Sequence, residues 1–403
     1  MKTIGVVAEY NPFHNGHEYH LAESRRKAGE GAAVIAVMSG DFVQRGEAAV
    51  YSKYARAEAA CRCGADLVAE LPLPWSLASA ESFAKAAVQL LAAMNADAVS
   101  FGCETEDLDE LTSVAELIGQ ESFIDRVRAA LKENPEQSFA AARQQTAELL
   151  SGRKIDCLRQ PNGILAVEYL KAIQQGGFSI QPLIVRRRGA GHDETGGGEF
   201  ASARELRSRL AEGESIRASV PPAAEAVYSL EREKGREVTD PKRKDLLMLS
   251  RLRFLKREDY QALPDAGDGL GDRLYEAVRS GKDYASILKA AASRRHPLVR
   301  VQRVSLYAVL GITESDFQQT PQYIRVLAFN EKGRSLLHDL RDKASLPVLT
   351  KTAQVRTLDP TAEHCFSLGA DAHDFYTLHY SDAGIRVCGE DWRRGPAICT
   401  EKP

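Results

Sequence analysis

The chain has 403 residues, of which 44% are hydrophobic and 27% charged, and its formal net charge is −3. This length allows two or three domains, and the nearly neutral charge excludes a global attraction to nucleic acid, so an RNA partner requires a local basic patch. Seven scattered cysteines without a CxxC pair, and an N-terminus unlike a signal peptide, predict reduced thiols, a cytoplasmic location and no membrane partner.

Apolar runs alternate with helical patterns over the first hundred residues. This order predicts an α/β fold with a doubly wound parallel sheet, a Rossmann-like arrangement that binds ligands at the carboxyl ends of its strands. A helical insertion is expected over 106–176, then a strand over 179–187 and a helix from Ser202. The earlier strands are expected at 3–8, 32–38, 66–71 and 98–102, with helices at 17–28, 52–63 and 79–94.

The pattern changes beyond residue 215. Helical periodicity rich in Leu, Arg, Lys and Ala continues to about residue 345, and the final residues show no clear period. We therefore expect a nucleotide-binding catalytic domain over 1–215 and a mainly helical domain over 216–403, with the last residues as a small appended lobe.

The first strand ends in an Asn-Pro turn followed by His14-Asn15-Gly16-His17. A helix that begins here directs its free N–H groups and positive dipole end at a bound anion, and Gly16 lets the ligand approach the backbone. We expect His14 and His17 to be catalytic, donating hydrogen bonds as a nucleoside triphosphate is opened at its α-phosphorus. The alternative is an ordinary turn with two surface histidines.

The loop after the second strand, 38–47, contains Asp41, Gln44 and Arg45. Because neighbouring loops meet at one edge of a doubly wound sheet, we expect these side chains near the histidines. Asp41 is a candidate catalytic residue, and Gln44 and Arg45 are candidates for contacting a carboxylate or phosphate. A polar surface loop is the alternative. Lys53 and Arg56 share one helix face and either reach phosphates or remain in solvent.

Positive charge gathers in two further places. Arg186, Arg187 and Arg188 precede a Gly-rich loop, and Ser202 and Arg207 then begin a helix, which together predict an anion clamp. A second run has no carboxylate and is a candidate RNA surface, with a solvated helix face as the alternative. Its proposed RNA-contacting residues are Arg294, Arg295, Arg300 and Arg303.

The N-terminal half resembles the bacterial tRNA(Met) cytidine acetate ligases, a family of the nucleotidylyltransferase superfamily with the His-x-Gly-His motif. The resemblance covers about the first 210 residues well and the remainder only through looser features such as Arg325-Val326-Leu327-Ala328-Phe329. The segments that carry it are Gly5 to His17, Val37 to Glu47, Gly64 to Pro72 and Gln160 to Leu165.

The resemblance implies an enzyme that converts ATP and acetate to acetyl-adenylate and pyrophosphate, then acetylates N4 of the wobble cytidine of elongator tRNA(Met). ATP is a substrate, Mg²⁺ is expected with it, and no protein-bound metal is predicted. Relatives often carry Asn where this chain has Asp41, and Gly191-His192 departs from their pattern, which leaves Arg187 and Arg188 as alternatives. The residues implied in ATP binding are Val7, Ala8, Glu9, Tyr10, Asn11, Pro12, Phe13, His14, Asn15, Gly16, His17, Glu18, Tyr19, His20, Gly102, Asn162 and one of that arginine pair.

Two other functions use the same residues. One is a nucleotidylyltransferase that acts on a phosphorylated small molecule, which requires a closed basic socket instead of a contiguous basic face. The other is a nucleotide-sensing or RNA-binding protein that holds ATP without turnover.

Overall fold

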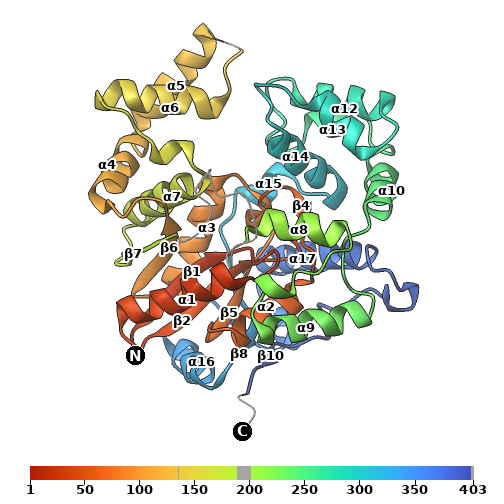
Figure 1. The fold of residues 1–403 in the computed structure, drawn as a ribbon. Helices are drawn as coiled ribbons and strands as arrows, with labels where there is room; N and C mark the ends of the chain where they lie inside the picture. The colour runs from red at the N-terminus through yellow and green to blue at the C-terminus, as the bar shows by residue number, and fades with distance from the viewer. Residues whose placement is uncertain (135, 188–200, 401–403) are drawn as a thin grey trace.

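The structure is a computed structural model that describes residues 1–134, 136–187 and 201–400. Its main sheet has the strand order β10-β8-β5-β2-β1-β6-β7, with β9 paired to β8 (Figure 1). The stretch β5-β2-β1-β6-β7 is parallel throughout and confirms the predicted doubly wound arrangement. These strands are β1 (Thr3–Ala8), β2 (Ala33–Ser39), β5 (Leu67–Leu71), β6 (Ala98–Cys103) and β7 (Gln181–Arg186).

Both faces of the sheet are covered, which explains why residues facing both sides of its central strands are mainly apolar. Along β2, Val34 and Ala36 pack into one hydrophobic cluster, while Ile35 and Val37 pack into another. Helices α1, α2, α8 and α9 contribute to the first cluster, and α3, α7, α16 and α17 to the second. These helices are α1 (Asn15–Ala28), α2 (Lys53–Arg62), α3 (Ala80–Ala93), α7 (Pro161–Gly176), α8 (Ala203–Ala211), α9 (Pro222–Glu233), α16 (Glu331–Lys343) and α17 (Pro360–Thr377).

The predicted helical insertion lies between β6 and β7. Its helices α4 (Leu108–Ile118), α5 (Glu121–Glu133) and α6 (Phe139–Ser151) precede the short 3-10 helix η2 (Cys157–Arg159) and then α7. In Figure 1 they form a yellow arm on one side of the molecule. A second arm on the other side contains α10 (Pro241–Leu252), α11 (Arg257–Gln261), α12 (Leu270–Ser280), α13 (Tyr284–Ala291) and α14 (Leu298–Leu310).

The sheet extends beyond the part of the chain for which the sequence predicted it. Strand β8 (Ile324–Phe329) pairs antiparallel with β5, and β10 (Ala397–Ile398) pairs with β8, so both sides of the predicted 215–216 boundary contribute to one sheet. Strand β8 is wholly buried, and its short apolar run is indistinguishable by period from a helix segment. The short β9 (Val348–Leu349) and α15 (Glu314–Phe317) flank this region.

The last residues, expected to be a small appended lobe, instead include a long helix that belongs to the core. Helix α17 has 18 residues and packs across the second arm and the sheet, because Leu368, Ala372 and Tyr376 enter the core of that arm. Small and polar residues such as His373 are buried on this helix, which obscures its apolar stripe in the sequence. Within the described ranges, we find no helix long and apolar enough to cross a membrane.

Candidate active site at the carboxyl edge of the sheet

A cavity of about 530 Å³ lies at the carboxyl ends of β1, β6 and β7, where the strand order reverses. This is the position at which doubly wound sheets bind nucleotides. Its lining comes from β1 and the turn after it, the first turns of α1, the β3–β4 hairpin, α3, α7 and the start of α8. The hairpin consists of β3 (Phe42–Val43) and β4 (Glu47–Ala48).

His14 and His17 are fixed by the start of α1. The Nδ1 atom of His14 accepts a hydrogen bond from the Gly16 backbone N–H at 3.0 Å, and Nδ1 of His17 accepts one from the His14 N–H at 3.3 Å. The two rings stack with centroids 3.7 Å apart. Because each Nδ1 is an acceptor, the proton of each neutral ring resides on Nε2. Both rings therefore present an Nε2–H donor.

The imidazoles around the cavity are neutral near pH 7. Burial lowers the pKa of His14 to about 4, with the Arg187 guanidinium adding to the effect. Burial also lowers the pKa of His17 and takes that of His20 to about 4. The His20 ring hydrogen-bonds to Ser100 Oγ at 3.1 Å. Three neutral rings at a helix N-terminus favour an incoming anion through hydrogen bonds and the helix dipole.

Arg56 holds the ends of β1 and β2 together. Its guanidinium donates to the backbone carbonyls of Glu9, Ser39 and Gly40, and the side chain is fully buried. Both alternatives for Arg56, a phosphate ligand or a solvated residue, are therefore wrong. The sequence pattern wrongly indicated a phosphate-binding or solvent-exposed residue, because α2 carries charged side chains on the face that it buries. Arg56 instead positions the two loops that line the cavity.

The β3–β4 hairpin brings Gln44 and Arg45 to the cavity as predicted. The Gln44 backbone N–H donates to Glu9 Oε1 at 3.0 Å, and burial raises the pKa of that carboxyl. The Nε2 amide of Gln44 is buried and has no partner among the described residues. A buried donor without a partner at a cavity wall is suited to an acceptor atom of a ligand.

Asp41 does not line the cavity, although the sequence predicted it there. Its Oδ1 accepts from the Lys53 backbone N–H at 2.7 Å, and its Oδ2 lies 2.8 Å from His373 Nδ1. Although burial opposes both charges, each partner favours the other, so the pKa of His373 rises to about 9 and that of Asp41 falls to about 2. Asp41 is thus a structural anion whose partner on α17 is far away in sequence.

This pair belongs to a larger network of buried charges. Asp391 Oδ2 lies 2.5 Å from Lys53 Nζ and 2.6 Å from Arg325 Nη1, and both cations also contact Glu70. Lys53 is fully buried, so both sequence alternatives for it, a phosphate ligand or a solvated face, are also wrong. The network ties α2, β5, β8 and the C-terminal segment together beneath the β3–β4 hairpin.

Three predicted nucleotide ligands meet at the ends of β6 and β7. Asn162 Nδ2 donates to Glu104 Oε1 at 2.7 Å, and Arg187 Nε lies 3.6 Å from the same oxygen. A Cβ at Gly102 would lie 3.4 Å from Arg187 Cγ, in van der Waals contact, so the glycine leaves the backbone of this wall bare beside Arg187. Sequence reasoning missed the role of Glu104, which holds the two ligands together. Arg188 falls outside the described residues.

The structure brings most of the remaining predicted ligands to the cavity. Ser202 is the N-cap of α8, and Arg207 Nη1 donates to the Asn11 carbonyl at 2.9 Å. From the segment 7–20 the wall includes Val7, Ala8, Glu9, Tyr10, Asn11, His14, Gly16, His17, Tyr19 and His20. The residues of that segment outside the wall are Pro12, Phe13, Asn15 and Glu18, because Phe13 packs in the core and Glu18 faces solvent.

Apolar wall residues were missed by sequence reasoning. Phe83 of α3, Phe101 of β6 and Tyr169 of α7 line the cavity beside the predicted polar residues. They follow ordinary core periodicity, so their sequence gave no signal that distinguished a cavity wall from a packed interior. Flat apolar walls with a few polar groups are typical of nucleotide sites.

The predicted RNA-contacting arginines lie on the second arm, outside the cavity. Arg295 pairs with Asp268 at 2.9 Å, and Arg300 and Arg303 pair with Asp265. The run has no carboxylate in sequence, but these two aspartates partly neutralise it in space. Arg294 is exposed on the same surface.

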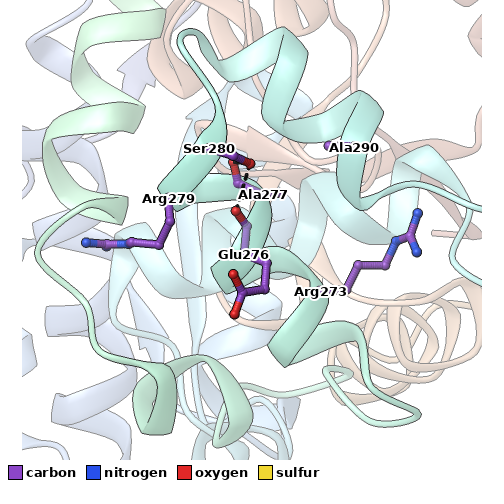
Figure 2. A pocket seen from close by; sticks show the side chains of 6 residues that line it. All are labelled: Arg273, Glu276, Ala277, Arg279, Ser280 and Ala290. Atoms are coloured by element: carbon purple, nitrogen blue, oxygen red, sulfur yellow. Dashed lines mark hydrogen bonds between the residues drawn. The ribbon is translucent and has the colours of Figure 1, made fainter.

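The second arm also has an open hollow of about 530 Å³ (Figure 2). Arg273 and Arg279 extend to opposite sides of it with Glu276 between them. Their guanidinium groups donate to the carbonyls of Ala291 and Arg253, so both arginines already have partners. Its wall lacks histidine and cysteine, and we find no cluster of metal-ligating side chains among the described ranges.

Comparison with known proteins agrees with a nucleotide-binding site at this edge of the sheet. The HIGH Nucleotidyl Transferase family model matches residues 1–388. The tRNA(Met) cytidine acetate ligase of Syntrophotalea carbinolica is 38% identical over 380 residues, covering 90% of this chain and 89% of the relative. The enzyme of the same name from Thermoanaerobacter sp. is 35% identical over 397 residues, covering 96% and 97%.

Two crystal structures of Thermotoga maritima TmcAL share the fold over the whole chain. The apo form is 30% identical with a TM-score of 0.92, and the form bound with alpha-thio ATP is 31% identical with a TM-score of 0.91. Each alignment covers 99% of this chain and 100% of the other.

Proposed function

Because the chain belongs to the tRNA(Met) cytidine acetate ligase family, we propose that it activates free acetate with ATP and acetylates N4 of the wobble cytidine of elongator tRNA(Met). The single observation that carries the first step is the pair of neutral imidazoles at the N-terminus of α1, facing a cavity that Arg45 also lines.

In the first step an acetate oxygen attacks the α-phosphorus of ATP. The new O–P bond replaces the bond to the β-phosphate bridging oxygen, and pyrophosphate leaves. Acetate is already ionised, so the step requires no base, and positioning and charge stabilisation dominate. The Nε2–H groups of His14 and His17 donate to phosphate oxygens as negative charge develops there.

In the second step the N4 amine of cytidine attacks the acetyl carbonyl carbon. A C–N bond forms, the C–O bond to AMP breaks, and the amine proton is released. Acetyl-adenylate is a mixed anhydride that water destroys, so the two arms beside the cavity have a protective role. The cytidine must leave its stack to enter, and an unpaired anticodon loop allows this at low cost.

Several contacts support this assignment of groups. The free Gln44 amide and Arg45 suit the acetate carboxylate, while Asn162 and Arg187 beside bare Gly102 suit the nucleotide. Mg²⁺ would arrive with the phosphates. Among the described residues, the cavity wall offers it one carboxylate, Glu9, which suits a hydrated ion and not an all-protein cage.

The predicted tRNA-contacting arginines adjoin this site. Gly46 of the hairpin lies against Gln302 and Arg303 of α14, where an added Cβ would approach Gln302 Cβ to 2.6 Å. Arg303 is therefore next to the loop that carries Arg45, where a tRNA backbone entering the cavity would pass. The other arginines of the run precede it on the same arm: Arg294, Arg295 and Arg300.

An ATP–pyrophosphate exchange assay tests the proposal. We expect labelled pyrophosphate to enter ATP only when acetate is present, because the reverse of the first step requires acetyl-adenylate. Exchange driven by a phosphorylated metabolite instead would establish the alternative, a nucleotidylyltransferase for small molecules. No exchange with any substrate would indicate a protein that binds ATP without turnover.

A further inference from the structure

Phe254 is the most exposed of the large hydrophobic side chains in the described residues, at 89% of its full exposure. It occupies the short turn between α10 and α11 of the second arm. A single exposed aromatic side chain does not by itself indicate a binding site. Phe254, however, lies on a turn held by hydrogen bonds and on an arm rich in positive charge.

The turn that presents Phe254 is held rigidly. Arg279 of α12 donates to the carbonyls of Arg253 and Leu255 at 2.8 and 3.3 Å, on either side of the phenylalanine. Arg253 in turn donates to the Gly281 carbonyl at 3.1 Å. A turn whose backbone is fixed in this way loses little conformational entropy when a partner stacks on the ring that it presents.

A second aromatic lies on the same surface. The guanidinium groups of Arg257 and Arg279 lie 4.5 and 5.2 Å from the ring centroid of Tyr275. Arg279 therefore connects this Arg–Tyr–Arg group to the turn of Phe254. Aromatic rings and arginine planes side by side are the groups on which unpaired nucleobases stack.

The charge of the arm favours RNA over a protein partner. Residues 241–303 contain fifteen Lys and Arg against eight Asp and Glu, in a chain whose net charge is −3. The other arm has the opposite sign, because residues 104–153 contain eleven acidic and five basic residues. A polyanion is thus attracted to the arm of Phe254 and repelled by the other.

The surface is within reach of the active site. Lys244, in the first turns of α10, interacts electrostatically with Glu47 and Arg207, and Arg207 lines the cavity. Phe254 follows ten residues later at the other end of this helix, about 15 Å away along its axis at 1.5 Å per residue. One tRNA loop can therefore touch both places.

We propose that Phe254, with the Arg257–Tyr275–Arg279 group, is a stacking site for unpaired nucleobases of the tRNA whose cytidine enters the cavity. The inference rests on the proposed function for the identity of the RNA. It assigns recognition to aromatic stacking, in addition to the phosphate contacts expected from the arginine run on α14.

The test compares binding of two RNAs by fluorescence anisotropy: a transcript of elongator tRNA(Met), and a fully paired duplex of its anticodon stem. Loss of one base stack predicts that Phe254→Ala weakens tRNA binding about ten-fold while duplex binding stays within about two-fold. Phe254→Trp should retain the wild-type affinity for tRNA. Leu149→Ala is the matched control, since Leu149 is 80% exposed on the acidic arm and should leave tRNA binding unchanged.

Equal tRNA affinity of the wild type and Phe254→Ala would overturn the proposal, as would an equal loss for tRNA and duplex. A change in self-association measured by sedimentation, with tRNA affinity unchanged, would assign the surface to protein contacts and also overturn it. Acetate-dependent ATP–pyrophosphate exchange by the wild type tests the proposed ligase function separately from the stacking site. If exchange is absent and the Phe254 effect is present, the proposed function fails and the stacking site remains.

Discussion

Replacing His14 or His17 with alanine is expected to lower the rate of acetate-dependent ATP–pyrophosphate exchange by about 100- to 1,000-fold. Each substitution removes one Nε2–H donor aimed at the phosphate oxygens, and the loss of one preorganised donor to a developing oxyanion has about this effect. The affinity for tRNA should remain close to that of the wild type, because neither ring lies on the basic arm. Exchange kinetics and tRNA anisotropy measure the two quantities.

His14 also caps α1, so the alanine variant should lose about 1 kcal/mol of stability in addition to its activity. His14→Asn separates the two effects, since an asparagine oxygen can accept the same backbone hydrogen bond but presents no group at the position of Nε2. We expect this variant to recover stability and not exchange. His338→Ala, at an exposed histidine on α16, should match the wild type in both. Loss of tRNA binding without loss of exchange would contradict the assigned role.

The Asp391→Ala substitution is expected to destabilise the fold by about 3–5 kcal/mol at pH 7. Despite burial, Lys53 and Arg325 keep the pKa of Asp391 well below its usual range. Its removal takes away one of the two carboxylates that these buried cations share and leaves Glu70 to face both of them. Breaking a buried ion pair on one side has this cost. Urea denaturation monitored by circular dichroism measures it.

An exposed ion pair gives the control for this experiment. Glu331 and Arg334 lie 3.4 Å apart on the surface of α16, and Glu331→Ala should change the free energy of unfolding by less than about 0.5 kcal/mol. If Asp391→Ala also changes it by less than about 1 kcal/mol, the network does not hold the C-terminal segment against the sheet.

The sequence was sufficient to predict those parts of the fold and site in which functional side chains follow a predicted strand within a few residues. Five parallel strands contain short, mainly apolar runs, and His14, Gly16 and His17 come after the turn that ends the first of them. Gln44 and Arg45 also reach the cavity, because loops at the carboxyl edge of a parallel sheet converge on one place. These predictions required only the strand order of a doubly wound sheet.

Contacts between distant segments were beyond sequence reasoning. Asp41 looked like a site residue because its partner His373 lies 332 positions away on α17, a helix that the sequence pattern did not predict. The prediction that Lys53 reaches phosphates or remains in solvent was wrong for the same reason. Its anionic partners Glu70 and Asp391 come from β5 and the C-terminal segment. Buried charges satisfied by remote partners leave no periodic signal.

The most direct test of the central claim is the fate of isotopically labelled acetate. The protein is incubated with ATP, ¹³C-labelled acetate and elongator tRNA(Met), and the tRNA is digested to nucleosides for mass spectrometry. We predict labelled N4-acetylcytidine at the wobble position, dependent on ATP and without acetyl-CoA. Unmodified cytidine under these conditions, or acetylation only from acetyl-CoA, would contradict the account.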